Sequence, residues 1–145
     1  QIDRIDLDGK GRAVIIDYKG GLDKSFSPAF DGNGDIPNIV HPQALIYAQV
    51  ARRELGLELL GSFYRSYRKR AVEGTYDARV IGPADLLGQK PFATTDEDGF
   101  NLLLDRCESL VAESLDRMFD GDISRTPSKE ACRFCPVLGC AKKEA

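Results

Sequence analysis

The stretch that decides the fold is IDRIDLDGKGRAVIIDYK, residues 2–19. Two runs rich in apolar and β-branched side chains, residues 2–7 and 13–18, flank the sequence DGKG at residues 8–11. Apolar runs joined by a short segment of Asp and Gly are typical of two antiparallel strands and their turn. The sequence therefore predicts a β-hairpin over residues 1–19.

The register of this hairpin decides which side chains share a face. If the loop is Gly9–Gly11, with Gly11 in the left-handed conformation of a bulge-type turn, then Asp3 lies directly opposite Asp17. Because side chains alternate along a strand, Lys19 falls on the same face as Asp17. A two-residue loop would place Asp3 and Asp17 on opposite faces, so the interpretation depends on this register.

Turn residues divide the rest of the chain into further elements. Pro42 and Gly56 bracket a predicted helix, with proline at its first position and glycine just past its end. Apolar residues at helical spacing predict a second, amphipathic helix over residues 97–119, which Gly121 ends. The remaining chain is expected to form a polar loop at 20–40, strands at 58–68 and 75–81, an irregular segment at 82–95 and a loop-like tail from 124.

These elements indicate an α/β fold in which the hairpin begins a mixed sheet and both helices pack against it. We expect residues 1–123 to form the core and residues 124–145 a cysteine-rich C-terminal tail. Because the chain starts without Met and enters strand-like sequence at once, we also expect an N-terminally truncated fragment of a longer protein.

The composition is that of an ordinary globular domain. The chain has 145 residues, 20 basic and 23 acidic side chains and a formal net charge of −3, a length that fits one domain. The mild net acidity excludes a strongly basic protein that coats nucleic acid. It does not exclude an enzyme that binds DNA through a local part of its surface. The longest aliphatic run, Ala13–Ile16, is far too short for a membrane span, and no signal-peptide pattern is present, so we expect a cytoplasmic location.

Two carboxylates and a lysine gather at one end of the predicted hairpin. Asp3 and Asp17 on one face would repel each other unless a cation lies between them, and carboxylates are the ligands that Mg²⁺ prefers. Lys19 would point at whatever the metal holds, where it could orient a bound water or stabilise charge on a phosphate. The alternative is a surface hairpin with solvated charges, because charged strand ends are common.

Four segments, in order along the chain, are similar to the motifs of a known family. They are Ile2–Asp6, Val14–Gly20, Gln43–Tyr47 and Cys132–Cys140. The first three resemble the RecB-like branch of the PD-(D/E)xK nuclease superfamily, and the fourth resembles the iron–sulfur tail of its AddB and Cas4 members. The resemblance implies a restriction-endonuclease-like mixed sheet flanked by helices.

The resemblance also implies a role for each matching residue. Asp3 and Asp17 would hold Mg²⁺ or Mn²⁺, and Lys19 would be the catalytic lysine. Gln43 and Tyr47 would form the family's Gln-x-x-x-Tyr motif near the active site. Residues four apart share a helix face, so both side chains can reach one phosphate or base.

The function implied in this way is metal-dependent hydrolysis of DNA, and exonuclease action is expected rather than endonuclease action. The natural context would be a helicase–exonuclease that processes DNA ends in recombinational repair, with a helicase domain or subunit as partner. A Cas4-like exonuclease is an alternative. A catalytically inactive DNA-binding or scaffolding module with the same fold is the rival, and this fragment could be inactive alone.

The cysteines at the C-terminus have metal-ligand spacing. Cys132, Cys135 and Cys140 follow the pattern C-x2-C-x4-C, and thiolates this close suit iron–sulfur clusters or zinc. The resemblance implies three ligands of a [4Fe–4S] cluster whose first cysteine would precede Gln1, so we expect the cluster to be absent or incomplete here. A zinc-binding interaction domain is an alternative. Cys107 lies on an apolar helix stripe and is expected to pack in the core.

Six basic residues form the main basic concentration of the sequence, and tyrosines are interleaved with them. One interpretation is salt-dependent gripping of DNA phosphates, and the other is a solvated hairpin tip and an ordinary helix end. Both remain open at this stage. The residues are Arg65, Arg68, Lys69 and Arg70, the expected DNA contacts, together with Arg52 and Arg53.

Overall fold

The computed structural model describes residues 1–28, 39–81, 93–95 and 97–122, together with 124, 132–133, 136–137 and 140. Of residues 93–95 and 97 it describes only the backbone. The chain divides into two compact units, Gln1–Val111 and Ala112–Ala145. The sheet and the candidate site belong to the first unit. The expected division after residue 123 stays a prediction.

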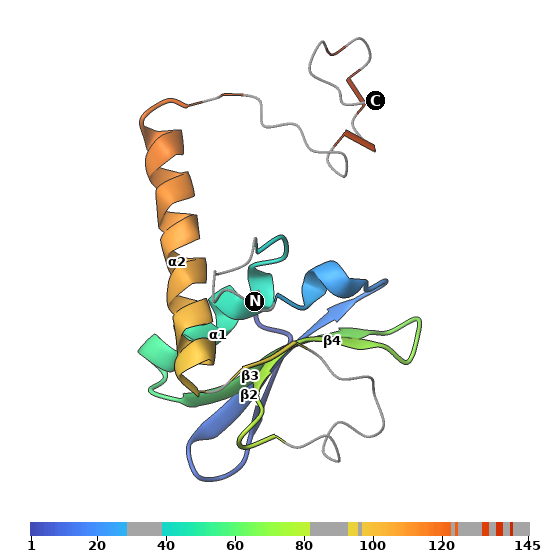
Figure 1. Cartoon of the computed structure of the whole chain (residues 1–145), viewed down its shortest axis with the longest axis vertical. Helices are drawn as coiled ribbons and strands as arrows, with labels where there is room; N and C mark the ends of the chain where they lie inside the picture. The colour runs from blue at the N-terminus through green and yellow to red at the C-terminus, as the bar shows by residue number, and fades with distance from the viewer. Residues whose placement is uncertain are drawn as a thin grey trace. The chain divides into compact units, whose positions relative to one another are not determined.

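The first unit contains a five-stranded mixed sheet with the strand order β1-β2-β3-β4-β5 (Figure 1). Neighbouring strands are alternately antiparallel and parallel: β1 and β2 form the hairpin, while β2 and β3 are parallel. The elements are β1 Arg4–Leu7, β2 Arg12–Lys19, the 3₁₀ helix η1 Lys24–Phe26, α1 Gln43–Glu54, β3 Glu58–Ser66, β4 Val72–Asp77, β5 Ala93–Thr95 and α2 Glu97–Phe119. The predicted α/β class is confirmed.

The hairpin has the predicted register. Arg4 pairs with Ile16, and every further pair of the ladder follows the same register. Gly11 has a φ of +83°, the left-handed conformation that glycine adopts without a Cβ clash. Continuing the ladder by one pair beyond the end of β1 places Asp3 opposite Asp17.

The long elements agree with the prediction closely. The helix predicted from residue 42 begins at Gln43, with Pro42 in the N-cap position, and Gly56 follows it with a φ of +64°. The helix predicted over 97–119 is observed with those bounds. Among the helices in the described part of the chain, none has the length and apolar character needed to cross a bilayer.

Two predictions about strands were wrong. The strand predicted at 75–81 occupies Val72–Asp77, because the Asp77 carbonyl accepts the N–H groups of Val80 and Ile81 and so turns the chain. The segment predicted as irregular contains β5, which pairs in parallel with β4. A strand of three residues is too short to produce an alternating pattern in the sequence.

Apolar side chains of β2 alternate between two cores, one on each face of the sheet. Ala13 and Ile15 point to the face covered by α1 and the N-terminal part of α2, whereas Val14 and Ile16 pack against Phe63 on the other face. The larger core consists of Ala13, Ile15, Leu45, Ala48, Ala51, Leu59, Phe100, Leu103, Leu104 and Cys107. This alternation puts the next odd-numbered residue of β2, Asp17, on the helix-covered face.

The apolar stripe of α2 is buried only in part. Cys107 is 1 % exposed within the larger core, as predicted, and burial raises the pKa of its thiol to about 11. Met118 and Phe119, near the C-terminal end of this helix, are 69 % and 87 % exposed.

Candidate active site

The site is centred on the C-terminal end of β2. Asp17 is 2 % exposed, because strand alternation turns it to the same side as the core residues Ala13 and Ile15. Lys19 Nζ lies 2.5 Å from Asp17 Oδ2. This oxygen has no hydrogen-bond partner of acceptable geometry, so its contact with the Lys19 ammonium is electrostatic. A carboxylate buried this deeply is tolerated only with a cation beside it, and Lys19 supplies that charge.

Asp3 is held at the same strand end. It precedes β1, is exposed, and its Oδ2 accepts the backbone N–H of Tyr18 at 3.0 Å. Tyr18 lies between Asp17 and Lys19, so the structure brings all three predicted charged residues to one end of β2. That the two carboxylates bind one metal ion stays a prediction.

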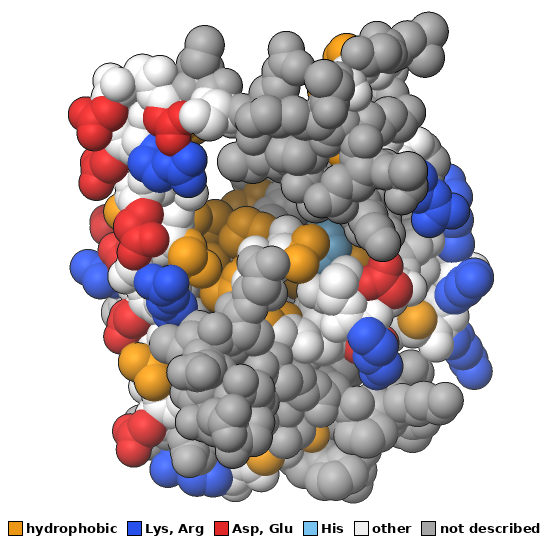
Figure 2. Space-filling view, turned by 45° about the horizontal axis from the view of Figure 1, so that its top comes forward, with side chains coloured by type: hydrophobic (Ala, Val, Ile, Leu, Met, Phe, Trp, Pro, Cys, Tyr) orange, Lys and Arg blue, Asp and Glu red, His pale blue; other side chains and the backbone are white. Residues whose placement is uncertain are grey.

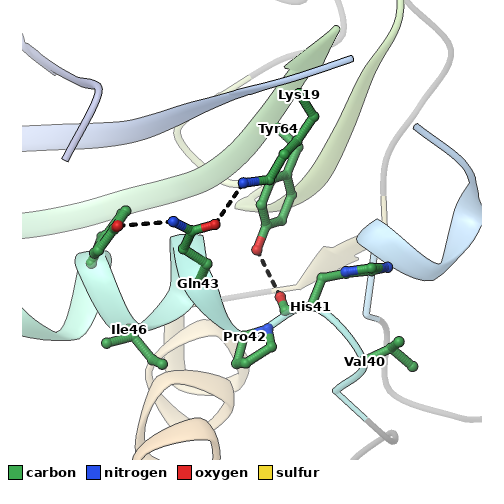
Figure 3. Close-up of a pocket in the computed structure, with 8 residues that line it drawn as sticks. Lys19, Val40, His41, Pro42, Gln43, Ile46 and Tyr64 are labelled. Atoms are coloured by element: carbon green, nitrogen blue, oxygen red, sulfur yellow. Dashed lines mark hydrogen bonds between the residues drawn. The ribbon is translucent and has the colours of Figure 1, made fainter. Parts of the chain in front are cut away.

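The start of α1 completes the cluster. Lys19 Nζ donates to Gln43 Oε1 at 2.6 Å, and Gln43 Nε2 donates to the Tyr47 hydroxyl at 2.9 Å (Figure 3). The spacing of four residues puts Gln43 and Tyr47 on one face of the helix. A continuous chain of polar contacts therefore runs from Asp17 through Lys19 and Gln43 to Tyr47.

Tyr64, which sequence reasoning did not assign to the site, fixes α1 against the sheet. It lies on β3 in register with Asp17 and is 2 % exposed. Its hydroxyl donates to the His41 carbonyl at 2.7 Å and accepts the N–H of Ala44 at 2.9 Å. Burial raises the pKa of this phenol to about 12, and the charge of Asp17 adds to the shift. The strand pattern alone could not identify it, since its role depends on which residue it faces across the ladder.

His41 is packed beside the cluster. Its ring stacks on Phe26 of η1, with centroids 3.6 Å apart, and its Nε2 lies 3.1 Å from Ser25 Oγ. Burial lowers the pKa of the imidazole, the charge of Lys19 lowers it further, and Asp23 acts in the opposite direction. The ring is therefore neutral at pH 7 and adds no positive charge to that of Lys19 at the start of α1.

A pocket of about 300 Å³ opens where β2 meets the start of α1 (Figure 3). Its lining is largely apolar, with the polar groups of Lys19, Gln43 and Tyr47 at one side. The lining residues are Lys19, Val40, His41, Pro42, Gln43, Ile46, Tyr47 and Tyr64.

The donor set at the end of β2 fits a hard divalent cation. Asp17 Oδ2 is a buried carboxylate oxygen without a hydrogen-bond partner of acceptable geometry, and the Lys19 ammonium beside it shows that the oxygen takes a positive charge as its neighbour. Asp3 supplies a second carboxylate at the same strand end, and carboxylate oxygens are the ligands that Mg²⁺ prefers. Among the described residues, no group of three or more His, Cys, Asp or Glu side chains is placed so that it could hold a metal ion.

The structure separates the predicted basic concentration into two parts. Arg52 donates to Asn101 and Asp105 of α2, and Arg53 donates to Glu108, so both arginines serve helix packing. These contacts favour the interpretation of an ordinary helix end for Arg52 and Arg53.

The four remaining basic residues are exposed, and their turn adjoins the site. The backbone N–H of Tyr67 donates to the Lys19 carbonyl at 3.1 Å. A Cβ added to Gly20 would lie 3.1 Å from the Tyr67 hydroxyl, so the turn packs directly on the chain after Lys19. The contact of these four residues with DNA stays a prediction. They are Arg65, Arg68, Lys69 and Arg70.

The cysteine tail is described only in part. Cys132 and Cys140 have partly exposed side chains, and Cys135 lies outside the described residues. The cluster predicted on these cysteines therefore stays a prediction.

Comparison with known proteins gives one finding. The family model described as the PD-(D/E)XK nuclease superfamily matches residues 1–140. Neither the curated proteins nor the solved structures give a significant match. The match spans the sheet, both helices and every residue of the polar chain from Asp17 to Tyr47, and the mixed sheet agrees with a restriction-endonuclease-like fold. The chain belongs to the PD-(D/E)XK nuclease superfamily.

Proposed function

We propose that this chain hydrolyses phosphodiester bonds of DNA with the help of Mg²⁺ or Mn²⁺. The observation that carries the proposal is the buried Asp17, whose Oδ2 lies 2.5 Å from Lys19 Nζ and has no hydrogen-bond partner of acceptable geometry. A buried carboxylate and a lysine at the mouth of a pocket are groups that a phosphodiesterase needs, one for a cation and one for the phosphate. Membership of a nuclease superfamily supports the same reaction.

Each residue has a distinct part in this proposal. Asp3 and Asp17 would hold the cation, which when bound supplies an activated water and neutralises charge on the phosphate. Lys19 places its ammonium at the mouth of the pocket, where it stabilises negative charge that develops on phosphate oxygens. Gln43 and Tyr47 are positioning residues, because their hydrogen bonds fix where the Lys19 ammonium lies.

The finer assignment is to the RecB-like branch. The contact of Lys19 with Gln43 supports it, because the Gln-x-x-x-Tyr motif of that branch then acts directly on the lysine. We infer an exonuclease that processes DNA ends beside a helicase domain or subunit, with Cys132, Cys135 and Cys140 as ligands of a [4Fe–4S] cluster. A Cas4-like exonuclease would use the same site.

The rival is a DNA-binding or scaffolding module that does not cut. Such a module has no need of a buried ion pair, because apolar side chains in its place are often as stabilising or more so. The charged contacts of Lys19 with Asp17 and Gln43 therefore favour the enzyme.

The proposal is tested by DNA degradation with Mg²⁺ or Mn²⁺. Linear single-stranded and double-stranded DNA, and a closed circle, are incubated with the unmodified chain, with Asp17→Asn and with Asp77→Asn. Asp77 is the matched control, since it is 3 % exposed and paired with Arg79 at 3.0 Å but belongs to β4.

Loss of cleavage in Asp17→Asn alone, with closed circles left intact, is the expected result. Equal loss in Asp77→Asn would show that reduced stability explains the effect. If the unmodified chain cuts no substrate with either metal, the enzyme proposal fails and the binding module takes its place.

A further inference from the structure

We propose that Ser66 is a positioning residue, which fixes the basic turn between β3 and β4 to the chain that follows Lys19. DNA phosphates bound on that turn, residues 67–71, are thereby held at a set place relative to the bond that is cut. The inference deepens the proposed function and rests on it for the reaction.

The hydroxyl of Ser66 uses its whole hydrogen-bonding capacity. It donates to the Gly20 carbonyl at 3.0 Å, and it accepts the backbone N–H groups of Arg68 at 3.2 Å and Lys69 at 3.1 Å. A serine hydroxyl has one donor and two acceptor positions, so all three are filled. The residue is 7 % exposed. Ser66 therefore joins the turn to the residue that directly follows Lys19.

Lys19 itself is held by the same region. Its backbone pairs with Ser66 in the ladder between β2 and β3, and its carbonyl accepts the N–H of Tyr67 at 3.1 Å. The Tyr67 ring packs on Gly20, because a Cβ at Gly20 would lie 3.1 Å from the Tyr67 hydroxyl. The place of the turn and the place of the Lys19 backbone are therefore set together.

The turn presents positive charges that have no counter-charge in the described part of the chain. Arg68, Lys69 and Arg70 are exposed, and none of them forms an ion pair with a described residue, in contrast to the arginines of α1. The Arg68 guanidinium lies over the Tyr67 ring, 5.7 Å from its centroid. Figure 2 shows Lys and Arg side chains gathered along the right edge of the molecule, the side on which the β3–β4 hairpin ends in Figure 1. Cations on a fixed turn suit the phosphates of a nucleic-acid backbone.

Contacts remote from the reacting bond raise kcat only when they help to orient that bond, and otherwise they change KM alone. The covalent backbone of DNA fixes the spacing of its phosphates, so a phosphate held on the turn limits where its neighbours can lie. While Ser66 ties the turn to Lys19, binding on the turn directs a phosphodiester toward the lysine. Without the hydroxyl, the cations remain but their distance from Lys19 is no longer fixed.

The test compares two substrates that contain the same kind of bond. A single-stranded oligothymidine has phosphates for both Lys19 and the turn, whereas the dinucleotide TpT has a single phosphate and leaves none for the turn. Cleavage with Mg²⁺ or Mn²⁺ is measured for the unmodified chain, Ser66→Ala, Ser66→Thr and Ser62→Ala. Ser62 is the matched control, because it lies on the same strand, is 2 % exposed, and its hydroxyl forms no hydrogen bond with the described residues.

For the unmodified chain, we expect kcat on the oligonucleotide to exceed kcat on the dinucleotide by about 10-fold to 100-fold, the effect of orienting the reacting groups. Ser66→Ala should lose most of this difference through a lower kcat on the oligonucleotide, with an unchanged rate on the dinucleotide. Ser66→Thr keeps the hydroxyl and Ser62→Ala keeps every hydrogen bond, so both should retain the difference. A general loss of structure would instead lower both rates together.

DNA binding in EDTA, measured by fluorescence anisotropy, separates the charges of the turn from their positioning. Ser66→Ala retains every cation, so the salt dependence of its binding should equal that of the unmodified chain. Arg68→Ala removes one phosphate contact and should lower the slope of log K against log salt by about 1. An unchanged slope in Arg68→Ala would show that the turn does not bind phosphate and would overturn the inference.

Equal kcat on the two substrates in the unmodified chain would also overturn the inference, and this comparison holds even if Ser66→Ala does not fold. So would a Ser66→Ala variant that loses activity equally on both substrates. In either case the chain still cuts DNA, so the nuclease proposal stands and only the positioning role of Ser66 is removed. If the unmodified chain cuts neither substrate, the nuclease proposal fails and the inference fails with it.

Discussion

Replacing Lys19 with methionine removes the positive charge beside the buried Asp17 and keeps a side chain of similar length. The Asp17 side chain is 3 % exposed and the Lys19 side chain is 31 % exposed, so the variant leaves a buried carboxylate without a counter-charge. Breaking a fully buried pair in this way costs about 3–5 kcal/mol of stability. Because water reaches Lys19, we expect a smaller loss of about 2–3 kcal/mol in the free energy of unfolding.

The double variant Asp17→Asn/Lys19→Met gives the diagnostic comparison. A neutral amide needs no counter-charge, so we expect the double variant to be more stable than Lys19→Met alone, by about 1 kcal/mol. The assay is urea unfolding followed by circular dichroism, since the chain has no tryptophan to report by fluorescence. If the double variant is less stable than Lys19→Met, Lys19 does not stabilise the buried charge of Asp17.

The same variants test the metal site without any measurement of activity. A cation on Asp17 would replace the lost ammonium, so Mg²⁺ at ten times its Kd is expected to stabilise Lys19→Met by about 1.4 kcal/mol. Asp17→Asn is expected to gain nothing. An equal gain in both variants would place the ion elsewhere.

Three further predictions follow from packing and charge. The pKa of His41 is lower in the folded chain than in the unfolded one, so the unfolded state binds more protons and stability falls as the pH drops below about 6.5; His41→Phe should flatten this dependence in urea unfolding at pH 7.5 and 5.5. Gly74→Ala would put a Cβ 2.2 Å from the Ser62 carbonyl oxygen at a φ of +141°, so we expect no folded protein by circular dichroism. Arg68→Ala should weaken DNA binding and its salt dependence, whereas Arg53→Ala, which only loses its bond to α2, should leave both unchanged.

The sequence predicted the parts of the site that depend on local pattern. The turn at Gly9–Gly11 sets the register of the hairpin, and that register places Asp3 opposite Asp17. Helical spacing likewise puts Gln43 and Tyr47 on one face of α1. These predictions needed only the periodicities of strands and helices, which a single sequence displays.

Contacts between distant segments could not be predicted in this way. The ion pair of Arg52 with Asp105 of α2 depends on how the two helices pack. A run of basic residues has the same sequence whether its side chains bind DNA or form ion pairs within the protein. The three residues of β5 form a strand only because β4 offers an edge to pair with. Propensity is a weak guide where tertiary pairing decides the outcome.

Tyr64 connects the strand motif around Asp17 with the helix motif around Gln43. Its hydroxyl holds the His41 carbonyl and the Ala44 N–H, which fixes the start of α1, while its backbone pairs with Asp17 on β2. The distance between Lys19 and Gln43 is therefore set by a residue of a third element, which belongs to neither of the motifs it joins. An active site that combines a strand motif with a helix motif needs such a connection, because each motif fixes only its own residues and neither fixes the other.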